Sequence, residues 1–98
     1  MFYEITLITP ENNTAEDMAE IRSTIEKWAD IHTAEDNGVK RLAYAITLNG
    51  VEHNFGHYLF YTATLNDGDP QRLSAELCRD DKVLRHLIVK ADRNYIKH

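Results

Sequence analysis

The sequence predicts an α+β domain with the element order β-α-β-β-α-β, in which two helices cover one face of a four-stranded antiparallel sheet. Three observations support this fold class: four segments alternate apolar residues with period two, two segments show helical spacing, and the segments follow one another in that order. The order is that of the ferredoxin-like (split β-α-β) fold, which leaves one sheet face without helices. Since 98 residues suffice for one such core, we predict a single domain over residues 1–98.

The first strand and the first helix are predicted from residues 2–30. Residues 2–8 alternate, which predicts a strand whose buried side carries Tyr3, Ile5 and Leu7. Thr14 and Asp17 then have the spacing of a capping box. An amphipathic helix ending near residue 30 is predicted from the helical spacing of Met18, Ile21, Ile25 and Trp28, with Trp28 in the core.

The second strand is predicted between residues 31 and 48. Its later part alternates, with Leu42 and Tyr44 on one side and Arg41 and Ala43 on the other. Asn37-Gly38 fits either a two-residue hairpin turn or a glycine-assisted bulge within one long strand. The residues alone leave both readings open.

The third strand follows a predicted polar loop at residues 49–56 and spans residues 58–65. Its buried side is predicted to carry Leu59, Tyr61, Ala63 and Leu65. Tyr58 and Phe60 lie on the opposite side, which Thr62 and Thr64 mark as the less buried one.

The last helix and strand occupy residues 69–90. Asp69 is predicted as the N-cap of a short helix, with Pro70 at its first position and Leu73 and Leu77 facing the core. The apolar run that follows predicts a strand over residues 82–90. If His86 and Ile88 face the core, Arg85 shares the sheet face of Tyr58.

The charge of the chain is unevenly distributed. The formal net charge is −5, which taken alone argues against a binder of polyanions. Residues 1–39 hold nine acidic and two basic side chains, whereas residues 40–98 hold seven acidic and nine basic ones. Because charges beyond about 8 Å are screened at physiological salt, the second half is able to contact nucleic acid while the first half faces water. The alternative, which the charges alone favour, is that these side chains are solvated surface charges.

Motifs for catalysis, metals and membranes are missing from the sequence. His53 and His57 are four residues apart, but no cysteine or carboxylate cluster completes a metal set, and Cys78 is predicted to be a buried structural thiol. No Gly-rich phosphate loop, nucleophile motif or apolar run of about 18 residues is present. The sequence therefore predicts no enzyme, cofactor, metal site or membrane span, and no small-molecule substrate.

The uncovered sheet face is the strongest candidate for function. Aromatic side chains on a central strand of this topology stack on unpaired bases in RNA-binding folds, and Tyr58 and Phe60 have that spacing. Arg41 and Arg85 have the parity to join them. The competing interpretation is that Tyr58 and Phe60 are partly buried under loops or a partner protein.

Four segments together resemble the bacterial small-subunit ribosomal protein six family. They are Met1-Phe2-Tyr3-Glu4-Ile5, Gly38-Val39-Lys40-Arg41-Leu42-Ala43-Tyr44-Ala45-Ile46, Gly56-His57-Tyr58-Leu59-Phe60-Tyr61, and Asp81-x-Val83-Leu84-Arg85-His86. The likeness covers nearly the whole chain in the right order. It places Gly38 inside one long strand and therefore favours the bulge.

The resemblance implies a cytoplasmic, ribosome-associated structural protein without catalytic activity or cofactor. It would bind the central domain of small-subunit ribosomal RNA together with ribosomal protein eighteen. The motif positions that this implies for the RNA or partner surface are Tyr3, Lys40, Arg41, Tyr58, Phe60 and Arg85, with Lys90 extending the basic edge. The acidity of the chain then indicates a need for a basic partner.

Two departures from the family pattern keep alternatives open. Phe2 stands where a basic residue is common, and Ala45 where the family usually has proline. These suggest a free-standing single-stranded nucleic-acid-binding paralogue as the first alternative. The second is a dimeric ferredoxin-like small-molecule enzyme, which would need a polar pocket around His57, Tyr58 and His86.

Overall fold

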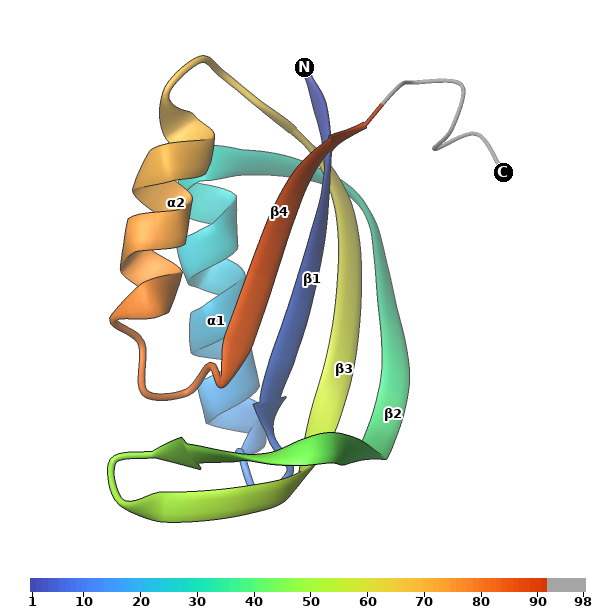
Figure 1. Cartoon of the computed structure of the whole chain (residues 1–98). Helices are drawn as coiled ribbons and strands as arrows, with labels where there is room; N and C mark the ends of the chain where they lie inside the picture. The colour runs from blue at the N-terminus through green and yellow to red at the C-terminus, as the bar shows by residue number, and fades with distance from the viewer. Residues whose placement is uncertain (92–98) are drawn as a thin grey trace.

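The computed structural model describes residues 1–91 and confirms the predicted ferredoxin-like order. Its strands are β1 (Phe2–Pro10), β2 (Ala29–Leu48), β3 (Val51–Leu65) and β4 (Arg85–Ala91), and its helices are α1 (Ala15–Trp28) and α2 (Asp69–Cys78). The antiparallel sheet has the order β2-β3-β1-β4, and both helices cover the same face (Figure 1). Residues 92–98 of the predicted domain lie outside the described residues.

The hydrophobic core lies between the helices and the sheet. The predicted buried sides of β1 and β3 are confirmed, since Ile5, Leu7 and Ala63 have no exposed surface. Fully burying one such aliphatic side chain stabilises the fold by about 1.5–3 kcal/mol. The helices contribute Ile21, Ile25, Leu73 and Leu77, and Trp28 packs partly buried against this core.

Strand β2 is continuous, so the bulge is confirmed and the hairpin at Asn37-Gly38 is wrong. The register passes from Asp36 opposite Leu59 to Val39 opposite His57, which leaves two residues of β2 facing one residue of β3. Gly38 adopts a positive φ of 79°, a conformation that glycine adopts without steric cost. Its N–H donates to Asp36 Oδ1 at 2.8 Å, which holds the bulge.

The hairpin turn lies at the second Asn-Gly pair. Leu48 pairs with Val51, and Asn49 and Gly50 between them have φ values of 52° and 77°, as a type I′ turn requires. The predicted loop at residues 49–56 is therefore wrong, because β3 begins at Val51. Residues 42–55, here called the arm, leave the plane of the sheet and cross its end (Figure 1).

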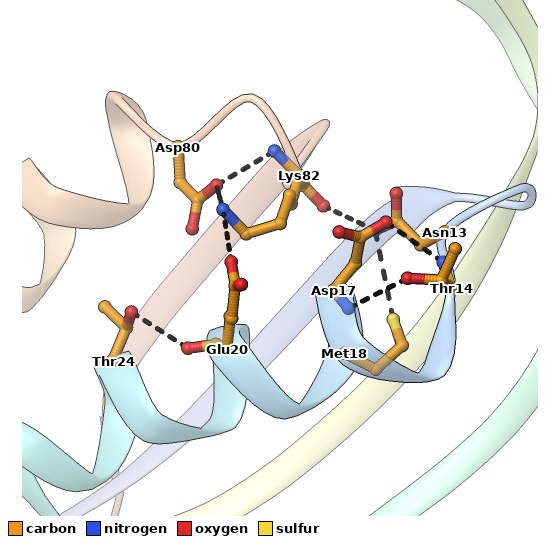
Figure 2. Close-up of polar contacts among 8 residues, drawn as sticks. All are labelled: Asn13, Thr14, Asp17, Met18, Glu20, Thr24, Asp80 and Lys82. Atoms are coloured by element: carbon orange, nitrogen blue, oxygen red, sulfur yellow. Dashed lines mark hydrogen bonds and ion pairs between the residues drawn. The ribbon is translucent and has the colours of Figure 1, made fainter.

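The start of α1 confirms the predicted capping box. The Asp17 N–H donates to Thr14 Oγ1 at 3.1 Å, and the Thr14 N–H donates to Asp17 Oδ2 at 3.0 Å (Figure 2). Both bonds satisfy donors that a helix start leaves unpaired.

A second set of contacts ties α1 to the loop before β4; we call Asn13, Glu20, Asp80 and Lys82 the α1 anchor. Asn13 Nδ2 donates to the Lys82 carbonyl at 2.9 Å (Figure 2). The Lys82 ammonium lies 2.9 Å from Asp80 Oδ1 and 3.3 Å from Glu20 Oε2. The hydrogen bond to Asp80 raises the pKa of Lys82. The anchor therefore fixes the chain three residues before Arg85.

Two predicted boundaries in the last third of the chain are corrected, and the predicted burial of Cys78 is wrong, because its side chain is exposed at the end of α2. The N-cap of α2 is Gly68 rather than Asp69, and Asp69, the first helical residue, instead accepts a bond from Arg72 Nη1 at 2.8 Å. Strand β4 begins at Arg85 rather than at residue 82, because the preceding residues form a turn with Val83 N–H bonded to the Asp80 carbonyl. Within β4, His86 bonds Ser74 of α2 at 2.8 Å, which confirms that it faces the helices.

Candidate nucleic-acid interface

The sheet face opposite the helices, here called the open face, is built from alternate residues of paired strands. Phe60 lies opposite Thr6, and Tyr58 lies opposite Ile8, which in turn lies opposite Arg85 of β4. Tyr58 and Phe60 are on the predicted face and are partly buried. Thr62 shares that face but is only 5% exposed, and its hydroxyl bonds that of Thr33 in β2.

Lys40 lies on the open face beside Tyr58. It is paired with Gly56, two residues before Tyr58 on the same side of β3. Its ammonium is 5.5 Å from the centre of the Tyr58 ring, within the range of a cation–π interaction. The cation is thus held over the aromatic ring and remains exposed to solvent.

Arg41 lies on the other side of β2, so its predicted place on the open face is wrong. It is paired with Phe55, and its guanidinium carbon is 6.0 Å from the centre of that ring. Alternation along β2 places Arg41 and Lys40 on opposite sides. The alternation in the sequence showed that the side chains of Arg41 and Leu42 point to opposite sides of the strand. It did not show which of the two shares the face of Tyr58.

Gly56 allows the arm to approach the sheet closely. The position that a Cβ would occupy at Gly56 is filled by Ile8 Cγ2, and Leu42 Cδ2 would be 3.2 Å away. Leu42 is therefore 8% exposed although it belongs to the arm. Next to this contact lies a hollow of about 160 Å³, whose lining includes Ile8, Leu42, Ala43, Tyr44, Tyr58 and Arg85.

Strand β4 adds Arg85 and two apolar side chains to the open face. Arg85 has the predicted parity and reaches the hollow. Leu87 is 59% exposed and Val89 is 45% exposed on the same side. The sequence did not single out this exposed pair, or Tyr44 and Phe55 on the arm. The predicted last strand carries apolar residues on both of its sides, and this pattern could have indicated that Leu87 and Val89 are exposed on the open face.

Two of the predicted site residues lie on the helix side of the sheet. Tyr3 packs against the core, and Lys90 is paired directly with it, so both point away from the open face. Lys90 is exposed at the end of β4. The structure therefore brings together Lys40, Tyr58 and Arg85, with Phe60 next along the strand, and separates them from Tyr3 and Lys90.

Within residues 1–91, the cations of this region form no ion pair with a carboxylate. Among residues 1–91, ion pairs form at Arg22, Lys27, His57, Arg72 and Lys82, and none involves Lys40, Arg41, Arg85 or Lys90. We call Lys40, Tyr58 and Arg85 the basic end of the open face. Glu4 and Glu35 lie on the same face, opposite Thr62 and Phe60 respectively, so its remaining part is acidic.

The histidines near the arm do not assemble into a catalytic or metal-binding group within the described chain. His57 Nε2 lies 2.5 Å from Asp36 Oδ1, and this hydrogen bond is the main cause that lowers the pKa of Asp36. His57 and His86 have helix-side parity while Tyr58 faces the other way, so the three do not converge. Residues 1–91 contain no cluster of three metal-ligating side chains, and neither of their helices is long and apolar enough to cross a membrane.

Comparisons with known proteins agree with this architecture. Residues 2–90 match the family model described as Ribosomal protein S6. A search of curated protein sequences found no significant match. Among solved structures, the chain is similar to the 30S ribosomal protein S6 from Thermotoga maritima, with a TM-score of 0.75 and 19% sequence identity over 98% of this chain and 92% of that chain. At that identity the structural likeness supports the fold.

The fold and the site define an α+β domain of ferredoxin-like topology, whose open face ends in aromatic side chains and in cations without an ion pair among residues 1–91. Since the family match extends over residues 2–90, the chain belongs to the ribosomal protein S6 family. The resemblance found in the sequence is thereby confirmed, and with it the class of small-subunit ribosomal proteins.

Proposed function

We propose that the chain is a structural constituent of the small ribosomal subunit that binds the central domain of its ribosomal RNA together with ribosomal protein eighteen. Membership of the ribosomal protein S6 family supports a place in the small subunit. The observation that carries the RNA contact is the basic end, where Lys40 and Arg85 flank an aromatic ring without a carboxylate partner among residues 1–91. The protein acts in the cytoplasm on the ribosome and performs no catalysis.

Each cation has a role that follows from its position. Lys40 and Arg85 contact phosphates, and Tyr58 and Phe60 offer a ring surface to a base or an apolar partner group. Arg41 contacts a phosphate from the other side of β2, and Lys90 does so from the end of β4. Tyr3 acts indirectly, by packing β1 against the core. Because phosphate contacts release counterions, we expect binding that weakens steeply with salt.

The rest of the open face suits a basic protein partner. Glu4 and Glu35 supply negative charge, and the exposed Leu87 and Val89 supply apolar area. Complementary charge raises the rate and the specificity of association. A basic partner on this part of the face would leave the basic end available to RNA, which explains how an acidic chain reaches a polyanion.

Sedimentation of small subunits tests the proposal. The native protein should co-sediment with the particles at low salt, and Arg85→Glu should reduce the bound fraction. Arg22→Glu is the matched control, because it makes the same charge change on α1, away from the open face. Exclusion of the native protein from the particles at low salt, or equal loss from both variants, would contradict the proposal.

A free-standing single-strand binder is the second candidate. It is favoured by Phe2, which occupies a position where the family commonly has a basic residue and whose ring lies 5.4 Å from that of His32. This candidate predicts binding to single-stranded RNA by a protein that stays out of small subunits, so the same sedimentation experiment decides between the two.

A further inference from the structure

The hollow next to the basic end has the volume of a small binding site. It has a volume of about 160 Å³, and its apolar floor is made by Ile8 and Leu42, which meet where Gly56 has no side chain. Tyr58 borders it from the sheet and Tyr44 from the arm. The site therefore combines two tyrosines from different strands with an apolar floor.

Tyr44 is the side chain that packing alone does not explain. It is 85% exposed, more than the other exposed large hydrophobic side chains of residues 1–91. An aromatic ring at the rim of a hollow is able to stack on an unpaired base, as aromatic residues do in many RNA-binding domains.

The charges around the hollow favour a nucleotide over a neutral apolar ligand. Arg85 lines the hollow from β4, and Lys40 lies outside the lining but over the ring of Tyr58, which does line it. Two cations flanking a ring-sized space match the phosphates on either side of an extruded nucleotide.

The size of the hollow restricts which base it accepts. An engineered protein cavity of roughly 150 Å³ holds a benzene-sized ring. We propose that this hollow receives one unpaired pyrimidine base of RNA, held between Tyr44 and Tyr58, with its flanking phosphates on Lys40 and Arg85. The inference rests on the proposed RNA-binding function and adds the class of nucleotide and the place where it sits.

Fluorescence anisotropy of the full chain with labelled hexanucleotides tests the base preference. At low salt, hexauridylate and hexacytidylate should bind about tenfold more tightly than hexaadenylate, because only single-ring bases enter the hollow. Equal or tighter binding of hexaadenylate would overturn the inference.

Filling the hollow provides the matched test. Ala43→Phe places a ring in the hollow and should weaken hexauridylate binding about tenfold, the loss expected for one stacked base. Ala45→Phe is the control, because Ala45 is exposed on the same arm and does not line the hollow. Tyr44→Leu, at a position with little packing to lose, should weaken binding in the same direction. Unchanged hexauridylate binding by either Ala43→Phe or Tyr44→Leu would overturn the inference.

Binding assays with central-domain ribosomal RNA and with small subunits distinguish a failure of this inference from a failure of the proposed function. If the native protein binds the ribosomal RNA and the small subunits but Ala43→Phe does not weaken its binding to hexauridylate, the proposed function is supported and the pyrimidine site is excluded. If Ala43→Phe loses its place in the subunit but keeps hexauridylate binding, the hollow holds a protein side chain and the inference is again overturned. If the native protein binds none of these RNAs, both fall.

Discussion

The α1 anchor and the basic end of the open face both depend on lysine or arginine, but their cations have different surroundings. In the anchor, Lys82 lies within 3.3 Å of two carboxylates. At the basic end, Lys40 and Arg85 meet aromatic and apolar groups and no carboxylate among the described residues. Only three positions in the sequence separate Lys82 from Arg85.

The difference separates cations that hold the fold from cations left available to a partner. A neutralised lysine presents little net charge to a polyanion, whereas an unpaired one attracts it within a Debye length of about 8 Å. Substitutions in the α1 anchor should therefore change the stability of the fold without changing RNA affinity. Substitutions at the basic end should change RNA affinity without changing stability.

The largest effect is expected from reversing both charges of the basic end. Lys40→Glu combined with Arg85→Glu removes two charge-assisted contacts of about 1.5–3 kcal/mol each, which corresponds to a loss of at least about 100-fold in affinity. The measurement is titration of a central-domain RNA fragment in the presence of the partner, repeated at several salt concentrations. The salt dependence should become shallower.

Urea unfolding of the same double variant supplies its control. Neither residue is in an ion pair within residues 1–91, and Lys40 loses only an exposed cation–π contact with Tyr58, so the free energy of unfolding should stay within about 1 kcal/mol of the native value. Unchanged RNA affinity, or a large loss of stability, would show that the two regions are not separable in this way.

Gly56→Ala is expected to lower both the stability of the fold and the affinity for RNA. Its Cβ would occupy the place of Ile8 Cγ2, and this overpacking should lower the free energy of unfolding by about 1–3 kcal/mol and displace the arm. Both urea unfolding and RNA titration should report the change. Adding Ile8→Ala removes the colliding methyl group and should recover part of the stability, with a coupling above about 0.5 kcal/mol. Additive losses would contradict this account of the contact.

The anchor is tested by Asn13→Ala. This removes the hydrogen bond to the Lys82 carbonyl and should lower the free energy of unfolding by about 1 kcal/mol without changing RNA affinity. The control is Asn12→Ala in the same loop, where the side chain is exposed and the expected change lies within about 0.5 kcal/mol. A similar loss from both variants would assign the effect to the loop rather than to the bond.

The part of the fold that packs on the core was predictable from the sequence. Leu59, Tyr61 and Ala63 alternate because one side of β3 is buried, and the same alternation correctly placed Tyr58 and Phe60 on the open face. The capping box was equally readable, since its two bonds join residues three positions apart.

The β2 half of the arm, residues 42–48, was predicted as strand from its alternation, but the β3 half, residues 51–55, escaped prediction because its residues are largely exposed and polar. A strand pair beyond the core needs no alternation, so the polar residues before Gly56 read as a loop. Two Asn-Gly pairs offered the same turn signal, and only pairing across β2 and β3 decides between them. The bulge at Gly38 then shifts the register of β2, which is why sequence parity misplaced Arg41 and why the hollow was not foreseen.

The smallest effect concerns pH and the contact between β4 and α2. Burial lowers the pKa of His86, whose ring bonds Ser74 on the helix side of the sheet. Since the folded-state value lies below that of the unfolded chain, about 6.5, the unfolded state binds more protons between the two values. The stability that His86 contributes is therefore present above the unfolded value and is lost as the pH falls through the folded one.

Comparing urea midpoints at pH 7.5 and pH 5.5 isolates this contribution. The native chain should lose more stability on acidification than His86→Gln, which cannot be protonated in that range. Asp36 does not blur the comparison, because its pKa is lowered from an already acidic value and His57 remains beside it in both proteins. RNA affinity at pH 7.5 should be equal in the two, since His86 points away from the open face. Equal acid sensitivity would mean that the neutral His86 ring does not stabilise the β4–α2 contact.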